Sequence, residues 1–166
     1  MTILLSLVLL TSCASLRTAE ECNRLGMQAR TAGDYEEAIK YLKCAVEKDP
    51  ENYEYINNLG RAYFKTGDYR NAALTFLKAA GINPADTGVL MNLGAAYGNM
   101  HEYAKAAEAY LKAIEQNAHE YRAYFELAVI HIMEGSLDKA YEIYRKLSDL
   151  APGQAGELLK ILKGQR

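Results

Sequence analysis

The sequence predicts an all-α protein made of about four stacked helix–turn–helix repeats. Three observations support this: a period of 34 residues, apolar residues at helical spacing, and a turn signal that recurs between helices. Four positions show the period most clearly: Leu25, Leu59, Leu93 and Leu127; Gly26, Gly60, Gly94 and Ala128; Ala38, Ala72, Ala106 and Ala140; and Leu42, Phe76, Tyr110 and Tyr144. Such a period is typical of arrays in which each repeat buries its apolar face against the next.

The second repeat shows how one unit is expected to pack. Its first helix is expected at about residues 53–66 and its second at about residues 69–81. The first helix carries one stripe at the i, i+3, i+4 and i+7 positions, which consists of Ile56, Leu59, Gly60 and Tyr63. Small residues at Gly60 and Ala72 allow the two helices to approach closely, and Phe76 fills the space beside them. Helices this short are marginal alone in water, so stacking must stabilise them.

The turn within each repeat carries glycine followed by a capping residue. Gly67-Asp68 combines a residue that tolerates positive φ with one that accepts hydrogen bonds from the next helix's free amides. Gly33-Asp34 and Gly135-Ser136 repeat this device, whereas His101-Glu102 of the third repeat is the weakest fit. Prolines end three of the repeats because proline cannot continue a helix: Pro50, Pro84 and Pro152.

This pattern resembles the tetratricopeptide repeat (TPR), whose signature has Leu-Gly, Tyr, Ala, Phe and Pro at these spacings. The second repeat matches it best, with Ile56, Leu59-Gly60, Tyr63, Ala72, Phe76, Ala79 and Pro84. The resemblance covers about residues 19–154 and implies a right-handed superhelix, with repeats at about 19–52, 53–86, 87–120 and 121–154. It also implies a protein that holds another protein and is not an enzyme.

A C-terminal helix is expected to cover the last repeat, followed by a short tail to residue 166. Residues 155–163 carry one more apolar stripe at helical spacing: Ala155, Leu158, Leu159 and Leu162. Lys160 and Lys163 lie off this stripe, as expected for a capping helix with a solvated outer face.

The N-terminus differs in kind from the array. Residues 3–10 form an uncharged apolar run, which is too short to span a bilayer but fits the core of a secretory signal. Leu10-Thr11-Ser12-Cys13 also resembles a bacterial lipobox, which implies a signal peptide at 1–12, a lipidated Cys13 and a tether at 13–18. No Lys or Arg precedes the run, so a cytosolic protein is the alternative. With Ala14 after the cysteine, the resemblance favours the outer membrane and a chain that faces the periplasm.

The concave side of the array is the expected binding site for a partner segment. It should be lined by the stripe of each first helix next to the inward stripe. These residues are Asn57, Asn58, Arg61, Phe64, Lys65, Met91, Asn92, Asn99, Arg122, Phe125, Glu126 and Met133. Asn58 and Asn92 resemble part of the asparagine ladder of peptide-binding TPR arrays, and Gly98 leaves room for side chains. The alternative is that asparagine is simply common at this position and that Phe64 and Phe125 complete the core.

The lysine–asparagine clamp by which chaperone-tail TPR domains hold a terminal carboxylate is not present. Only Asn58 stands at a matching position, and Asn23 and Gly88 stand where that clamp has lysine.

Other candidate chemistry is weak. A net charge of −2 gives no basis for binding nucleic acid, and the three histidines lack metal-ligand spacing, so no metal, cofactor or catalytic residue is expected. His131 shares the register of Tyr63 and Tyr97 and is expected to be a hydrogen-bonded core imidazole. An oxidising periplasm would allow Cys22 and Cys44 to pair, but Cys44 falls at a solvent-facing register, which favours free thiols.

The sequence thus favours a non-enzymatic, lipid-anchored adaptor in the bacterial envelope that binds another protein or a peptide segment. Outer-membrane TPR lipoproteins of similar layout assist secretin or type IV pilus assembly, or act as scaffolds for murein hydrolases. A cytosolic TPR regulator or co-chaperone and a self-assembling TPR module (a homo-oligomer) are the two alternatives.

Overall fold

The computed structural model describes residues 17–164 of the chain, so the apolar run, Cys13 and most of the expected tether lie outside the described residues. Within this range the secondary structure is entirely helical, which confirms the expected fold class. The helices are α2 (Ala19–Ala32), α3 (Tyr35–Lys48), α4 (Tyr53–Lys65), α5 (Tyr69–Ile82), α6 (Thr87–Asn99), α7 (Tyr103–Gln116), α8 (Tyr121–Met133), α9 (Leu137–Leu150) and α10 (Pro152–Gly164).

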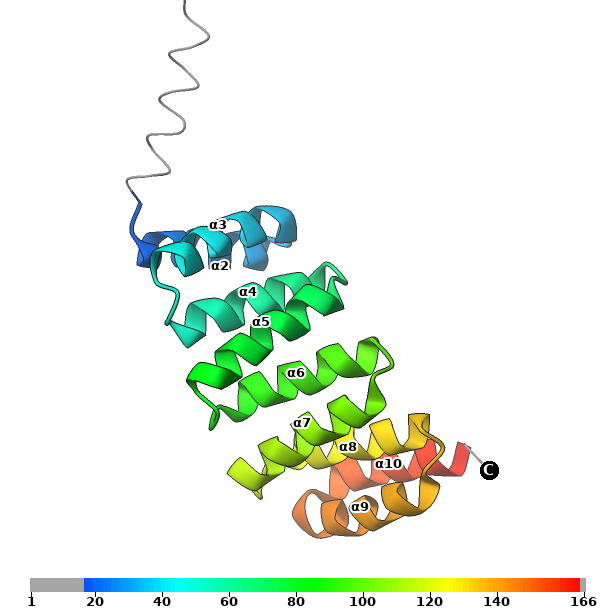
Figure 1. Cartoon of the computed structure of the whole chain (residues 1–166). Coiled ribbons are helices and arrows are strands. Elements are labelled where there is room, and N and C mark those ends of the chain that lie inside the picture. Colours follow the sequence, from blue (N-terminus) through cyan, green and yellow to red (C-terminus); the bar gives the residue numbers. More distant parts are fainter. Residues whose placement is uncertain (1–16, 165–166) are drawn as a thin grey trace, which may run out of the picture.

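The helices stack as four hairpins in chain order (Figure 1). Each hairpin packs its two helices together, and its second helix then contacts the first helix of the next hairpin. The first helices also touch one another, α2 against α4 and α4 against α6, while no comparable contact joins α3 to α5 or α5 to α7 within residues 17–164. The first helices of the first three repeats therefore form the more crowded inner layer of the superhelix, and the second helices lie on its outside.

Small residues set the spacing inside three of the hairpins. A Cβ atom added to Gly60 would lie 2.6 Å from Cε1 of Phe76, and one added to Gly94 would lie 2.7 Å from Cε1 of Tyr110. A Cβ atom added to Gly26 would likewise lie 2.6 Å from Cγ of Leu42. Each glycine thus allows the large side chain of the second helix to lie directly on the first helix.

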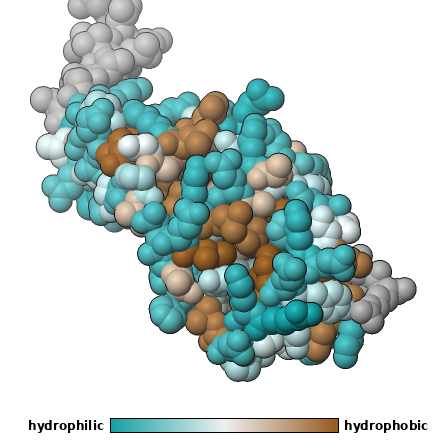
Figure 2. Space-filling view, turned by 60° about the horizontal axis from the view of Figure 1, so that its bottom comes forward, coloured by the Kyte–Doolittle hydropathy of each residue, from teal (hydrophilic) through white to brown (hydrophobic). Residues whose placement is uncertain are grey.

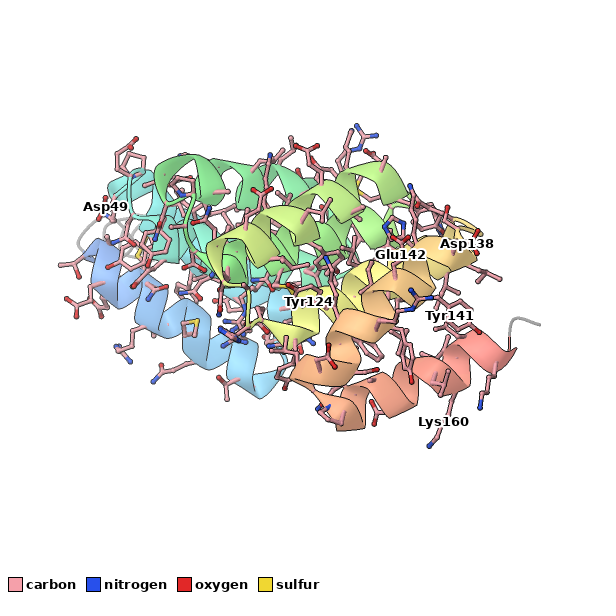
Figure 3. All side chains as sticks on the ribbon, turned by 90° about the horizontal axis from the view of Figure 1, so that it is seen from below. Asp49, Tyr124, Asp138, Tyr141, Glu142 and Lys160 are labelled. Atoms are coloured by element: carbon pink, nitrogen blue, oxygen red, sulfur yellow. A yellow bond between two sulfur atoms is a disulfide. The ribbon has the colours of Figure 1, made fainter. Side chains whose placement is uncertain are left out.

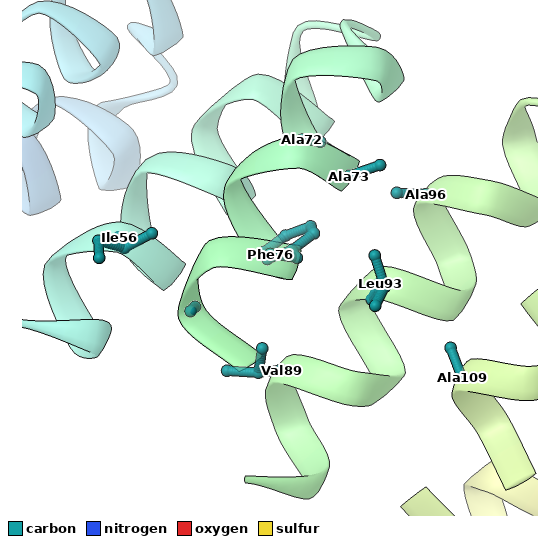
Figure 4. Packing of buried hydrophobic residues seen from close by; sticks show 9 residues of the cluster. Ile56, Ala72, Ala73, Phe76, Val89, Leu93, Ala96 and Ala109 are labelled. Carbon is teal, nitrogen blue, oxygen red and sulfur yellow. The ribbon is translucent and has the colours of Figure 1, made fainter. Parts of the chain in front are cut away.

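The core runs through the array from one repeat into the next. One cluster joins α4 to α7: Ile56 of α4, Ala72, Ala73, Phe76 and Ala79 of α5, Val89, Leu93 and Ala96 of α6, and Ala109 of α7 (Figure 4). Because these side chains come from two hairpins, burying them requires stacking, as expected for repeats too small to fold alone.

The turns follow the expected pattern in two repeats and depart from it in two. Gly33, Gly67 and Gly135 all have positive φ, and the carboxylates of Asp34 and Asp68 accept hydrogen bonds from the starts of α3 and α5. Ser136, expected to cap α9, makes no side-chain capping bond. In the third repeat His101 takes the left-handed conformation with φ 58°, so a non-glycine residue carries the strain of that turn.

A disulfide joins the helices of the first repeat, so the preference for free thiols at Cys22 and Cys44 is wrong. The two Cα atoms are 5.9 Å apart, with Cys22 fully buried and Cys44 partly buried. Cys44 shares its register with the exposed Lys78, which extends from the flank of the second helix into water. The short cysteine side chain at that place stays close to the helix surface and reaches α2 instead.

Helix α10 closes the C-terminal end of the array and begins three residues earlier than expected. Pro152 was expected to end the fourth repeat, but it is the first residue of α10, where its missing N–H has no cost. Leu158 and Leu162 are fully buried against α8 and α9, and Lys160 points away from the array (Figure 3).

Candidate partner-binding groove

The inner layer of first helices presents a row of equivalent side chains, because a spacing of 34 residues places them on the same face of successive helices. The predicted groove residues come from α4, α6 and α8, and the first repeat adds Asn23, Arg24 and Arg30 of α2 at the same registers.

Asparagine side chains join neighbouring first helices. Nδ2 of Asn58 donates to Oδ1 of Asn23 at 3.1 Å, and Nδ2 of Asn92 donates to Oδ1 of Asn57 at 3.2 Å. Asn58 and Asn92 were expected to offer their amides to a partner, and the structure shows one N–H of each already bonded. Each amide retains its carbonyl oxygen and a second N–H, which is enough to bond an extended backbone.

The groove is basic in its N-terminal half. Arg24 and Arg30 come from α2, and Arg61 and Lys65 come from α4. Desolvation and the nearby charge of Arg30 lower the pKa of the Arg61 guanidinium, although the residue remains exposed. This half of the groove therefore carries positive charge that is poorly compensated.

The middle of the groove is uncharged, because α6 contains no ionisable side chain apart from the phenol of Tyr97. Met91 is partly buried, and the Asn99 amide is bonded to the carbonyl of Ala95 in its own helix at 2.9 Å. The space at Gly98 was expected to receive a partner's side chain. Instead it is partly filled by Ile130, whose Cδ1 would lie 3.2 Å from an added Cβ.

The C-terminal half combines apolar and charged groups on α8. The side chain of Met133 is 50% exposed, whereas Phe125 is partly buried and packs against the core. Phe64, at the other end of the groove, is likewise partly buried and stacks edge-on against Tyr69 at 5.2 Å. Both phenylalanines therefore contribute to the core, as the alternative interpretation held, and offer only part of their surface to a partner.

Glu126 and Arg122 are the charged groups of this half. Desolvation raises the pKa of the Glu126 carboxyl group, although the residue remains exposed, and Arg122 offsets part of that rise. Glu126 in turn raises the pKa of Tyr110, although burial of the phenol is the larger cause.

Metal-ligating side chains and histidines are the remaining candidate groups of the described residues. No group of His, Cys, Asp and Glu that could hold a metal ion occurs within 17–164. Nδ1 of His131 lies 2.9 Å from a carboxylate oxygen of Glu134, which agrees with the expected hydrogen-bonded, largely buried imidazole. None of the described helices is long and apolar enough to cross a membrane.

A cavity of about 610 Å³ lies on the outer layer, between α5 and α7 and above α6. Its lining includes Leu77, Leu90 and Leu93, with Lys105, Glu108, Lys112 and Glu115 on α7 beside them. Leu74, Leu77 and Leu111 are 60%, 44% and 48% exposed, so apolar surface extends beyond the cavity. Figure 2 shows that apolar side chains gather near the middle of one face and are bordered by hydrophilic ones.

Comparison with known families decides the assignment of the fold. A family model described as tetratricopeptide repeat matches residues 23–87 and 91–155, which together cover most of the chain. The chain belongs to the tetratricopeptide repeat family. Its four repeats, its glycine–aromatic contacts and its capping helix are thus the features of a TPR array, which is a fold of protein–protein interaction scaffolds. A comparison with curated protein sequences found no match.

Solved structures of similar fold include several MamA proteins. One MamA structure is 28% identical to this TPR chain over 89% of it and 84% of the other chain, with a TM-score of 0.78. MamA from Desulfovibrio magneticus RS-1 is 22% identical, with 82% and 77% covered and a TM-score of 0.77. A chain of the APC/C hetero-tetramer Cut9-Hcn1 is 22% identical, with a TM-score of 0.75, and here 92% of this chain covers 31% of the other. The two matches at 22% identity show the shared fold alone.

Three residues of the groove were missed by the sequence analysis: Asn23, Arg30, and Arg24, which stands one repeat before Asn58. Asn23 stands one repeat before Asn57, and Arg30 stands one repeat before Phe64, so the period itself was the available signal. The irregular composition of the first repeat hid them, because Asn23 was judged only against a lysine clamp to which it does not conform.

Proposed function

We propose that this TPR protein is a non-enzymatic adaptor that binds an extended segment of another protein along its inner groove. The two inter-repeat asparagine pairs carry the proposal, because they place polar amide groups at a regular spacing along the groove. A bound backbone can satisfy their remaining donors and acceptors, and Met133 and the exposed edge of Phe125 offer apolar contact.

A photocrosslinking experiment tests this use of the groove. A photoreactive amino acid at Met133 should crosslink a discrete protein in the native cell, and the same group at Lys78 on the outer layer should not. Equal crosslinking from both positions, or crosslinking from Lys78 alone, contradicts groove binding.

We further propose that the chain is exported and anchored by lipid at Cys13, facing the periplasm, on the outer rather than the inner membrane. The apolar run and Leu10-Thr11-Ser12-Cys13 motivate this, and the Cys22–Cys44 disulfide supports it because such bonds persist in oxidising compartments. Cys13→Ser should abolish the uptake of labelled fatty acid, while the native protein should resist salt washing because two or more acyl chains anchor stably. An intact Met1 by mass spectrometry would instead support a cytosolic regulator or co-chaperone.

Within the envelope, assembly of a secretin or type IV pilus, or scaffolding of cell-wall enzymes, are the roles that suit such an adaptor. Identification of the crosslinked protein distinguishes them.

Self-association through the outer layer is a second candidate function. The cavity between α5 and α7 has an apolar floor and carries both lysine and glutamate at its edge, so two copies related by a two-fold axis can pair opposite charges. Light scattering should then show a dimer that Leu77→Ser with Leu111→Ser converts to a monomer. A wild-type protein that is monomeric at high concentration excludes this function.

A further inference from the structure

The N-terminal half of the groove contains two arginines whose charges have no acidic partner. Neither Arg30 of α2 nor Arg61 of α4 forms an ion pair within residues 17–164, although four other pairs occur there. The carboxylates of the two following turns, Asp34 and Asp68, accept hydrogen bonds from the first turns of α3 and α5. Both guanidinium groups therefore remain available.

Arg30 also carries an unsatisfied donor. Its Nε is the single buried side-chain nitrogen or oxygen among the described residues that lacks a hydrogen-bond partner. A buried donor without a partner lowers stability, and one attached to a permanent charge does so more strongly. Such a donor is free to bond an acceptor that a partner brings to the groove.

The two guanidinium groups come from helices α2 and α4, which touch each other in the inner layer, and they lie within electrostatic range of one another. Arg30 disfavours the charge on Arg61, so two like charges share one part of the groove. The Asn23–Asn58 hydrogen bond fixes α2 against α4 nearby, with Arg61 one turn after Asn58. An anion between two adjacent guanidinium groups removes their repulsion and accepts hydrogen bonds from both.

We propose that Arg30 and Arg61 bind a side-chain carboxylate of an acidic partner segment, whose backbone lies on the neighbouring asparagine pairs. This site rests on the proposed groove function and deepens it, because it states the chemistry of the partner. The asparagines favour a carboxylate carried by a peptide over a free anion, since they supply donors and acceptors for a backbone beside the charge. The arrangement differs from the lysine–asparagine clamp for a chain terminus, which this sequence lacks.

The test begins with selection from a random peptide library on the immobilised full chain. The proposal predicts that enriched peptides share an Asp or Glu at one position. The most enriched peptide is then synthesised with that residue as the acid and as its amide, and its Kd is measured by fluorescence anisotropy. Amide replacement should weaken binding by about tenfold or more, as should Arg30→Gln or Arg61→Gln, because charge-assisted hydrogen bonds are lost.

A matched control removes the same charges elsewhere. Arg70→Gln with Arg145→Gln alters two exposed arginines of the outer layer and should leave the Kd unchanged. Melting curves of each variant establish that it is folded. Raising the salt concentration should weaken binding of the acidic peptide more than binding of its amide form.

Each outcome separates the two proposals. One outcome is that the enriched peptides share no acidic residue, and that their Kd is unchanged by both Gln variants but raised by Asn58→Ala and Asn92→Ala. This result overturns the carboxylate site and leaves groove binding intact. Peptides whose Kd is the same for the parent protein and for every groove variant overturn both proposals. A library that yields no binder also overturns both. Inorganic phosphate is the last probe. If it binds in a way that depends on Arg30 and Arg61, and the acidic peptide does not bind there, the site is a phosphate site and the proposal is overturned.

Discussion

Glycine determines how closely the two helices of each hairpin approach. Gly60 is buried beneath Phe76, and Gly94 is buried beneath Tyr110, so the aromatic ring of the second helix occupies the space that a side chain on the first would need. Sequence alone could predict this pairing, because the same small and large positions recur every 34 residues.

Enlarging these positions should destabilise the protein. Gly60→Leu and Ala72→Leu overpack the hairpin, which should lower the free energy of unfolding by about 1–3 kcal/mol or more, measured by urea denaturation. Gly156→Ala is the matched control, since nothing lies within 4 Å of the added Cβ in α10, and it should be neutral or slightly stabilising. Unchanged midpoints for both leucine variants would show that the inward stripe is wrongly assigned.

Arg61 should limit the stability of the protein without ligand. Its pKa is lowered by desolvation first and by the charge of Arg30 second, which means that folding disfavours its charged form even though the residue is exposed. A base with a lowered pKa opposes folding at neutral pH, so Arg61→Gln should melt at a temperature no lower than the parent at pH 7 and low salt. A clear fall in melting temperature would indicate that Arg61 has a stabilising partner.

At the scale of elements, the disulfide between α2 and α3 adds a covalent link to the packing of the first repeat. Cys22 stands where the second repeat has the buried Ile56, and Cys44 where it has Lys78. The sequence could place both residues but not predict the bond. A side chain on the flank of a helix can reach either water or the partner helix, and the rotation of one helix against the other decides which.

Removing the disulfide should therefore loosen the first repeat. With a sequence separation of 22, its loss should lower the free energy of unfolding by about 3 kcal/mol. Urea denaturation with and without a reducing agent measures this loss. The double variant Cys22→Ala, Cys44→Ala is the control, and its unfolding midpoint should be the same with and without the reducing agent. Identical midpoints for the oxidised and reduced protein would contradict a stabilising bond.

Helix α10 should protect the fourth repeat. Leu158→Ala or Leu162→Ala removes a fully buried side chain and should cost about 2–5 kcal/mol, with faster hydrogen exchange in α8 and α9. Ile161→Ala, at a side chain that is 38% exposed on the same helix, should have a smaller effect. Equal effects from all three variants would show that α10 does not cover the array through this face.

At the scale of the whole molecule, the superhelix converts a linear repeat into a groove with a charge gradient. It is basic at α2 and α4, uncharged at α6, and mixed at α8. The fold, and the fact that the first helices line the groove, could be predicted from the 34-residue period. The asparagine pairs and the position of Ile130 beside Gly98 could not, because they depend on the rotation between successive repeats.

The central claim is that partners bind the inner groove, and one comparison of affinities tests it most directly. Asn58→Ala with Asn92→Ala should weaken binding of the crosslinked partner by about tenfold or more, because a hydrogen bond contributes about 0.5–1.5 kcal/mol and about 1.4 kcal/mol is tenfold. The same variant should also lose about 1–3 kcal/mol of stability, since each change breaks an inter-repeat hydrogen bond. Lys78→Ala with Lys112→Ala on the outer layer should bind normally. Loss of binding by the lysine variant, with full affinity in the asparagine variant, would contradict the account and place recognition on the outer layer.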